Sequence, residues 1–244
     1  MKVYWTEQTA ADVPLDDAWL SAAECTRLDA MLIAKRRADW RLGRWTAKSA
    51  VARYLRLVAP QDFRRIELRP APSGAPVVFL AGQPAPVTVS LSHRTGAAVC
   101  AVAEPGLALG CDLELIEPHS DAFIGDFFTA EEQALLARVA AAERNRLVAL
   151  LWSAKESALK AIRVGLRADT RSVAVSPADS LMYGSGTRVW RPLHLRFTGG
   201  QFAEGWWQDD GNLLRTLVAA PPPAAPILLA IPSAPRPTAQ TSRL

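Results

Sequence analysis

Two carboxylates stand one residue apart in the segment 108–116, which reads ALGCDLELI. Alternation of side chains predicts a strand here, so Asp112 and Glu114 project from the same face. Like charges held side by side repel each other, and a divalent cation between them removes that cost. The pair is therefore a candidate metal site. The simpler alternative is the solvent-facing side of an edge strand.

A second charged group lies in the segment 151–165, LWSAKESALKAIRVG. At 100° per residue its apolar residues form a broad arc, and Glu156 and Lys160 lie one turn apart on the narrow opposite arc. As a surface ion pair they would contribute about 0.3 kcal/mol. As site residues, Glu156 would be a third oxygen ligand and Lys160 a proton donor or phosphate contact. Periodicity alone does not choose between these interpretations.

Positive charge is concentrated between residues 35 and 69, where eleven Lys or Arg face three acids. Four of these cations form one stripe at helical spacing: Arg37, Arg41, Arg44 and Lys48. Such a stripe attracts anions such as phosphate, nucleic acid or an acidic protein, although a solvated helix face is the alternative. Ser92 and His93 end a predicted strand, where a hydroxyl and an imidazole could also meet a phosphate.

Helical and strand-like segments interleave along the chain. Helical periodicity runs from residue 21 to 57, with a break near 38–43, and resumes at 129–162. Thr129 and Glu132 form a capping box at the start of the second helical run. Strands are expected at 87–92, 97–103 and 108–116. Strands grouped between helical runs predict an α+β fold.

Two of the helical segments share a short sequence similarity, which we call the Trp-Ala-Lys echo. RWTAKSAVAR from Arg44 matches LWSAKESALK from Leu151 in its Trp, Ala and Lys, at an offset of 107 residues. Duplication of a half-domain and chance similarity of Ala-rich helices both explain such a match. Two halves of about equal size fit the length. The expected division is 1–115, 116–220 and a tail at 221–244.

The composition of the chain limits which classes of protein it can belong to. A chain of 244 residues that is 50% hydrophobic can bury one sizeable core or two smaller ones. Cys25, Cys100 and Cys111 lack metal-ligand spacing, which favours buried thiols in a reducing cytosol. We find neither an apolar leader nor a membrane-length run, so a cytoplasmic location is expected. The tail holds seven of 18 prolines and no acid, which predicts an extended or disordered segment beyond Ala220.

Taken in order, the motifs resemble those of the Sfp-like 4′-phosphopantetheinyl transferases. VSLSH, GCDLE, FFTAEE and WSAKESALK are similar to that family's S-H, G-x-D-x-E, F-[FS]-x-x-E and W-[ST]-x-K-E-[AS]-x-x-K pattern. RRADWRLGRWTAK resembles its basic coenzyme A-binding helix. The resemblance implies two similar α/β halves related by a pseudo-twofold, so that a monomer would suffice. It also implies transfer of 4′-phosphopantetheine from coenzyme A to a carrier-protein serine, with Mg²⁺ and release of 3′,5′-ADP.

The resemblance also implies a role for each candidate residue. Asp112, Glu114 and Glu156 would hold Mg²⁺. Glu132, or Glu156 through a water molecule, would act as the base, and Lys160 would neutralise or protonate the leaving 3′,5′-ADP. The residues expected to contact coenzyme A phosphates are Arg37, Arg44, Ser92, His93, Lys155 and Lys160.

One position departs from the family. Where G-K-P often precedes the S-H strand, this chain has Gly74-Ala75-Pro76. One cationic contact to coenzyme A is therefore missing, or it is supplied by Arg69 or Arg94.

Two other classes of function remain at this point. A Mg²⁺-dependent phosphohydrolase would use the same carboxylates but transfer to water. A nucleic-acid-binding module would use residues 35–69 alone, with strong salt dependence, and it leaves the acidic residues unexplained. We expect neither nucleic acid nor membrane among the partners.

Overall fold

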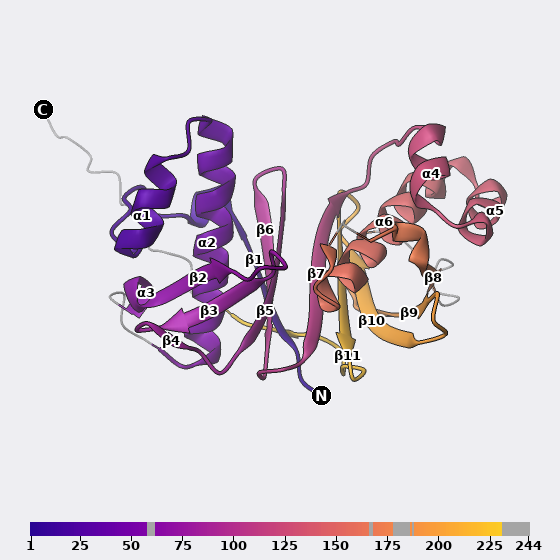
Figure 1. The fold of residues 1–244 in the computed structure, drawn as a ribbon. Helices are drawn as coiled ribbons and strands as arrows, with labels where there is room; N and C mark the ends of the chain where they lie inside the picture. The colour runs from indigo at the N-terminus through magenta and orange to yellow at the C-terminus, as the bar shows by residue number, and fades with distance from the viewer. Residues whose placement is uncertain (58–61, 166–167, 178–185, 187, 231–244) are drawn as a thin grey trace, which may run out of the picture.

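The computed structural model describes residues 1–57, 62–165, 168–177, 186 and 188–230. These residues form two lobes, each with a long helix packed on a sheet (Figure 1). Within the described ranges, no helix combines the length and apolarity needed to cross a membrane. Helices and mixed sheets together confirm the predicted α+β class.

The first lobe carries the helices α1 (Ala22–Asp29), α2 (Ala34–Tyr54) and α3 (Asp62–Arg65), and a 3-10 turn, η1 (Ala10–Asp12). Its main sheet has the order β12-β1-β6-β5, formed by Ile227–Leu228, Tyr4–Thr9, Ala97–Ala103 and Thr88–Arg94. A smaller sheet, β2-β3-β4, is formed by Ile66–Pro70, Pro76–Leu80 and Gln83–Pro84. β1 and β12 are parallel, whereas the other neighbours in these sheets are antiparallel.

The second lobe carries α4 (Asp121–Phe127), α5 (Ala130–Arg138), α6 (Ala141–Ala161) and η3 (Thr170–Ser172). Its antiparallel sheet has the order β7-β11-β10-β9-β8, formed by Ala108–Leu115, Leu213–Ala220, Phe202–Asp209, Arg191–Phe197 and Val173–Pro177. β7 pairs with β11 along its whole length. The expected boundary after residue 115 therefore needs correction, because β7 belongs to the second sheet.

The two main sheets face each other across a shared apolar layer. On β6, Val99 and Ala101 point into this layer, whereas Cys100 and Val102 pack on the side of α2. β6 therefore has two buried faces, which explains why it reads as a continuous apolar run instead of an alternating one. The buried guanidinium of Arg215 joins the sheets through two hydrogen bonds to the Glu7 carboxylate, at 2.6 and 2.7 Å.

A buried ion pair pins the long helix of the first lobe. Glu24 closes a capping box with Ser21 at the start of α1 and accepts a hydrogen bond from the backbone N–H of Leu68. The same carboxylate meets Lys48 Nζ of α2 at 2.5 Å. Lys48 is completely buried and also donates to two backbone carbonyls.

The second lobe repeats this arrangement about 107 residues later. Glu132 closes a capping box with Thr129 at the start of α5 and accepts from the backbone N–H of Val175. Lys155 of α6 reaches its carboxylate at 2.9 Å and donates to two carbonyl oxygens. The two lysines of the Trp-Ala-Lys echo therefore have the same role: each is the buried partner of a glutamate that closes a capping box.

The helix boundaries differ from the predicted ones in two places. The break expected near 38–43 lies at 30–33 instead, and α2 continues through Gly43. A Cβ at Gly43 would lie 3.2 Å from Leu91 Cδ2, so the glycine gives β5 room to pack against the helix. The helical run expected over 129–162 divides at Val139, whose backbone is extended and whose side chain packs on the core of the second lobe.

Part of the proline-rich tail is ordered against the first lobe, which corrects the expectation that structure ends near Ala220. Ile227 and Leu229 donate backbone hydrogen bonds to the carbonyls of Val3 and Trp5. Leu229 also packs against the core beneath α2. The apolar residues of ILLA therefore extend the sheet, despite the prolines that precede them. Residues 231–244 lie outside the described part of the chain.

A pair of truncations tests this docking. We expect a chain ending at Ala224 to melt about 5 °C below one ending at Ala230, because it loses β12 and the partly buried Leu229 side chain. Differential scanning calorimetry of the two truncated chains measures the difference. Equal melting temperatures would show that β12 adds nothing to the stability of the sheet.

Candidate active site

Several of the predicted site residues, among them Ser92, Asp112, Glu156 and Lys160, converge where the edge strands of the two sheets meet α6. β5 is the edge of the first main sheet and β7 the edge of the second, and α6 packs on β7. Gly110 permits this packing, because a Cβ there would lie 1.8 Å from the backbone oxygen of Ser157. The glycine of GCDLE therefore sets how closely the helix approaches the two carboxylates.

Lys160 is the centre of the polar cluster. Its Nζ lies 2.6 Å from Asp112 Oδ1 and 3.8 Å from Glu156 Oε2, and it donates to the Cys111 carbonyl at 3.2 Å. The Ser92 hydroxyl donates to the same Asp112 oxygen at 2.7 Å. Residues from β5, β7 and α6 thus share one network, and the Glu156–Lys160 pair is more than a surface contact.

Glu114 occupies a second corner of the cluster. The indole N–H of Trp152 donates to its Oε1 at 3.1 Å, and Arg94 Nε lies 3.4 Å from its Oε2. Trp152 packs edge-on against Phe123 and Phe127 of α4, with ring centroids 5.1 Å apart in both pairs. The sequence pattern assigned Trp152 no role in the site, because its hydrogen bond to Glu114 depends on how β7 and α6 pack together.

Burial shapes the titration of this cluster. Burial and the neighbouring Asp112 raise the pKa of Glu114 to about 7. Burial also raises the pKa of Glu156. For Lys160, burial lowers the pKa, but Asp112 and Glu156 outweigh it and the net pKa is raised. Lys160 is therefore held as a cation, while burial makes Glu114 and Glu156 harder to ionise.

The donor set fits a hard divalent cation. Asp112 Oδ2 is buried and has no hydrogen-bond partner in the described structure, and carboxylate oxygens are the ligands that Mg²⁺ prefers. Within the described ranges, however, no three His, Cys, Asp or Glu side chains are already gathered closely enough for a metal. The Lys160 ammonium contacts both Asp112 and Glu156. A metal ion that binds these carboxylates would therefore either lie beside this ammonium or displace it.

A cationic cavity of about 270 Å³ lies on the other side of β5. Four positively charged or titratable side chains line it: Arg27, Arg44, Arg69 and His93. Arg44 and His93 are among the predicted phosphate contacts. Arg69 from β2 was one of the two substitutes expected for the missing cation, whereas Arg27 from α1 was missed, since nothing in its sequence spacing connects it with Arg44. Such a group of cations can bind a phosphate.

Comparison with known proteins adds a family to this geometry. Residues 108–198 match the sequence model of the 4′-phosphopantetheinyl transferase superfamily. The chain contains a domain of this superfamily. The matched segment includes Asp112, Glu114, Glu156 and Lys160. Membership implies transfer of phosphopantetheine from coenzyme A to a carrier protein.

Comparisons with solved structures and with curated proteins give weaker similarities or none. A crystal structure of Helicobacter pylori holo-[acyl-carrier-protein] synthase in complex with coenzyme A is 17% identical to the chain. The match covers 42% of this chain and 98% of that one, with a TM-score of 0.33. No curated protein matches the sequence.

The side chains of the basic stripe (Arg37, Arg41, Arg44 and Lys48) mostly bind other groups of the protein. Arg37 Nη1 donates to the Leu28 carbonyl at 2.5 Å, and Arg41 pairs with Asp17 at 2.8 Å. Lys48 is buried against Glu24. Of the four residues of the stripe, Arg44 is the one that lines the cationic cavity. The expected phosphate contact by Arg37 is therefore not supported, because its guanidinium already braces the end of α1.

Glu132 and Lys155 also lie away from the cluster, in the interior of the second lobe. Lys155 is completely buried and Glu132 is 2% exposed. One Glu132 oxygen accepts from Val175 N–H, and the other meets Thr129 N–H and Lys155. A carboxylate enclosed in this way cannot accept a proton from a carrier serine, and Lys155 cannot reach a phosphate. We correct both expected roles to structural ones.

The raised pKa of Glu114 gives a pH-dependent stability. Its pKa is about 7 in the folded enzyme against an ordinary value of 4.5, so between these values the native state binds more protons than the unfolded chain. The free energy of unfolding should therefore fall as pH rises from 4.5 to 7, with about 1–3 kcal/mol attributable to Glu114.

Urea unfolding with a metal chelator at several pH values measures this effect. Glu114→Gln should remove that part of the pH dependence, since the amide does not titrate. Parallel curves for the wild type and the variant across this range would contradict the raised pKa.

Proposed function

We propose that the chain is an Sfp-type 4′-phosphopantetheinyl transferase that modifies a serine of an acyl- or peptidyl-carrier protein and releases 3′,5′-ADP. The observation that carries the proposal is the meeting of Asp112, Glu114, Glu156 and Lys160 beside a cationic cavity. Phosphoryl transfer is catalysed mainly by positioning and by charge stabilisation, and this arrangement supplies both. Both lobes belong to one chain, so a monomer would suffice.

The cationic cavity would bind nucleotide phosphates of coenzyme A. Arg27 and Arg44 supply positive charge from two helices, and His93 of β5 adds an imidazole that can hydrogen-bond a phosphate. Arg69 would take the place of the cation missing at Ala75, because it lines this cavity and Arg94 does not, although both arginines also pair with glutamates. The structure therefore favours the first of the two substitutes expected from the sequence.

Asp112, Glu114 and Glu156 would hold Mg²⁺, which would offset the charge that develops on the pyrophosphate during transfer. Glu156 is the remaining candidate base, because Glu132 is enclosed. Its raised pKa makes it a stronger proton acceptor when ionised. It would take the proton of the carrier serine, directly or through water. The serine oxygen then bonds to the phosphorus of phosphopantetheine, and the bond from that phosphorus to 3′,5′-ADP breaks.

Lys160 would stabilise the departing 3′,5′-ADP as a fixed cation. Its raised pKa keeps it protonated, which favours charge stabilisation over the proton donation that the sequence left open.

Lys160→Ala should lower the turnover number by roughly 10²-fold while the Michaelis constant for coenzyme A changes much less. Lys160→Arg should recover part of the rate because the guanidinium keeps the charge. Steady-state kinetics with melting curves as controls measures both, and an unchanged turnover number for Lys160→Ala would exclude the role.

Labelled coenzyme A and purified acyl and peptidyl carrier proteins test the proposal as a whole. We expect label to appear on the carrier in a Mg²⁺-dependent reaction, together with 3′,5′-ADP. A phosphohydrolase would release the same nucleotide without a carrier and leave the carrier unlabelled. The nucleic-acid alternative loses its basis, because most of the basic stripe is engaged by internal partners.

A further inference from the structure

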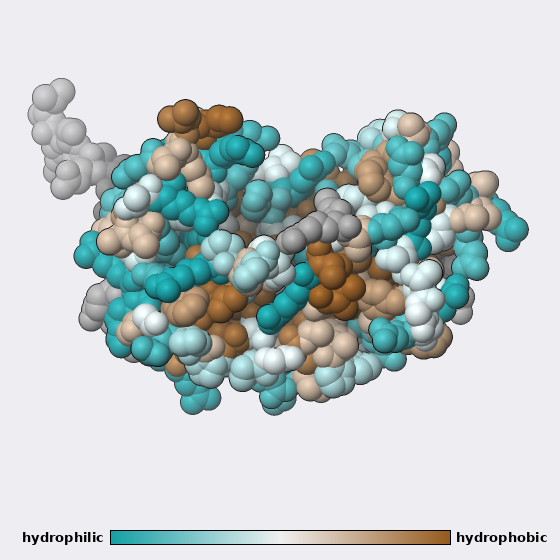
Figure 2. All heavy atoms as spheres, in the orientation of Figure 1, coloured by the Kyte–Doolittle hydropathy of each residue, from teal (hydrophilic) through white to brown (hydrophobic). Residues whose placement is uncertain are grey.

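A cavity of about 350 Å³ opens between the two lobes beside Lys160. Its walls come from the loop 73–76, from β5 and from the end of α6, and they include the apolar side chains of Val89, Leu91 and Leu109. Figure 2 shows this face hollowed between the lobes, with hydrophobic residues gathered where they meet. The cavity shares Lys160 with the carboxylate cluster and Leu91 with the cationic cavity. It therefore adjoins both parts of the proposed coenzyme A site.

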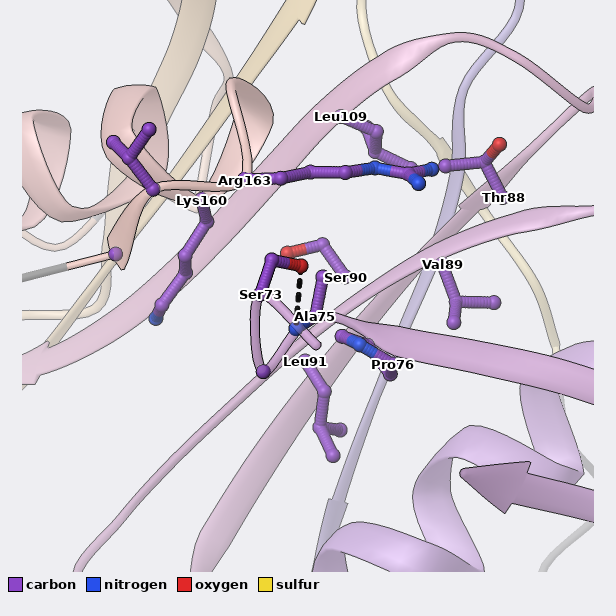
Figure 3. A pocket seen from close by; sticks show the side chains of 13 residues that line it. Ser73, Ala75, Pro76, Thr88, Val89, Ser90, Leu91, Leu109, Lys160 and Arg163 are labelled. Carbon is purple, nitrogen blue, oxygen red and sulfur yellow. Dashed lines mark hydrogen bonds between the residues drawn. The ribbon is translucent and has the colours of Figure 1, made fainter. Parts of the chain in front are cut away.

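Arg163 is the exposed cation of this cavity. Its side chain extends from the end of α6 across the cavity towards Thr88, whereas Lys160 leaves the helix in another direction (Figure 3). Lys160 is held by hydrogen bonds to Ser92, Cys111 and Asp112. Within the described ranges, the Arg163 guanidinium has neither a hydrogen bond nor an ion pair. It is therefore available to a ligand.

The backbone of Arg163 does not by itself indicate a function. Its φ of 59° follows from the turn that ends α6, where Val164 N–H bonds to the Leu159 carbonyl. Arg56 at the end of α2 has a φ of 57° and the same kind of turn. The two arginines occupy matching positions in the two lobes, but only Arg163 lines the cavity. Replacing Arg56 therefore shows the effect of removing an arginine from the same kind of turn when it does not line the cavity.

We propose that Arg163 is a specificity-determining residue that stacks its guanidinium on the adenine of coenzyme A. This inference rests on the proposed function. The planar guanidinium packs well on an aromatic ring, and the apolar side chains of Val89 and Leu91 offer the opposite wall. With phosphates held by Lys160 on one side and by the cationic cavity on the other, the base is the part of the nucleotide whose chemistry suits this cavity.

Calorimetric titration of the full chain with 3′,5′-ADP tests the proposal without the carrier. Arg163→Ala should weaken binding about 10-fold, and Arg163→Lys should regain little, because an ammonium lacks the planar face. Arg56→Ala should bind as the wild type does. In the transfer assay, the Michaelis constant for coenzyme A should rise about 10-fold for Arg163→Ala, while the turnover number changes less than twofold.

Inorganic pyrophosphate is the probe that lacks the base, and its affinity should be the same for the wild type and Arg163→Ala. An equal loss for pyrophosphate and 3′,5′-ADP, or full recovery by Arg163→Lys, would assign Arg163 to a phosphate and overturn the stacking. Unchanged 3′,5′-ADP binding by Arg163→Ala, in a chain that transfers normally, would overturn the inference and leave the proposed function standing. A wild type that neither transfers nor binds 3′,5′-ADP would instead reject the proposed function.

Discussion

Replacing Asp112 by Asn should reduce carrier-protein modification on the order of 10³-fold or more. Asp112 is the carboxylate that touches Lys160 and Ser92, and its second oxygen is buried without a partner. The amide keeps the volume but removes the charge that a cation at this site needs. We expect Mg²⁺ binding, measured by calorimetry, to be lost together with activity.

The fold should survive this change. Lys160 keeps Glu156 as a counter-charge at 3.8 Å, so the melting temperature should move by only a few degrees. Glu117→Gln is the matched control, because Glu117 lies just beyond β7 and pairs with Arg94 without contacting Lys160. A variant at Asp112 that turns over at the wild-type rate under limiting Mg²⁺ would show that these carboxylates do not hold the metal.

Replacing Lys155 by Met should lower the free energy of unfolding by about 3–5 kcal/mol. The change leaves the Glu132 carboxylate buried without its cation, and two backbone carbonyls lose a donor. Lys48→Met should cost a similar amount, because Lys48 makes the equivalent pair with Glu24 in the first lobe. Lys35→Met, at an exposed position of α2, should change stability by less than about 0.5 kcal/mol.

Urea unfolding at pH 7 measures all three variants. Adding Glu132→Gln to Lys155→Met should recover part of the loss, since the isolated buried charge disappears. Well below its melting temperature, Lys155→Met should still modify the carrier, because Lys155 does not reach the site. Loss of activity with unchanged stability would return Lys155 to the phosphate-binding role expected from the sequence.

The sequence alone determined the local features of this protein. Alternation along 108–116 predicted the strand that carries Asp112 and Glu114, and the observed β7 spans Ala108–Leu115. The capping box at Thr129 is present as predicted. Helical spacing put Glu156 and Lys160 together, and the observed pair is 3.8 Å apart. These features follow from backbone periodicity and short-range hydrogen bonds, which a few neighbouring residues decide.

The tertiary structure decided which charges are free to act. Helical spacing placed Arg37, Arg44 and Lys48 on one stripe, but Lys48 meets Glu24 and Arg37 meets the Leu28 carbonyl. Glu132 looked like a site carboxylate in its motif and is instead buried with its lysine.

Residues far apart in the sequence also make contacts that the motifs do not predict. Arg69 joins Arg44 in one cavity only because β2 lies near α2, and Leu229 packs on the first lobe after more than two hundred intervening residues. A sequence pattern fixes the face from which a side chain projects, but its partner depends on which distant segment packs there. Burial and that partner together determine whether a charge stabilises the fold or remains available for chemistry.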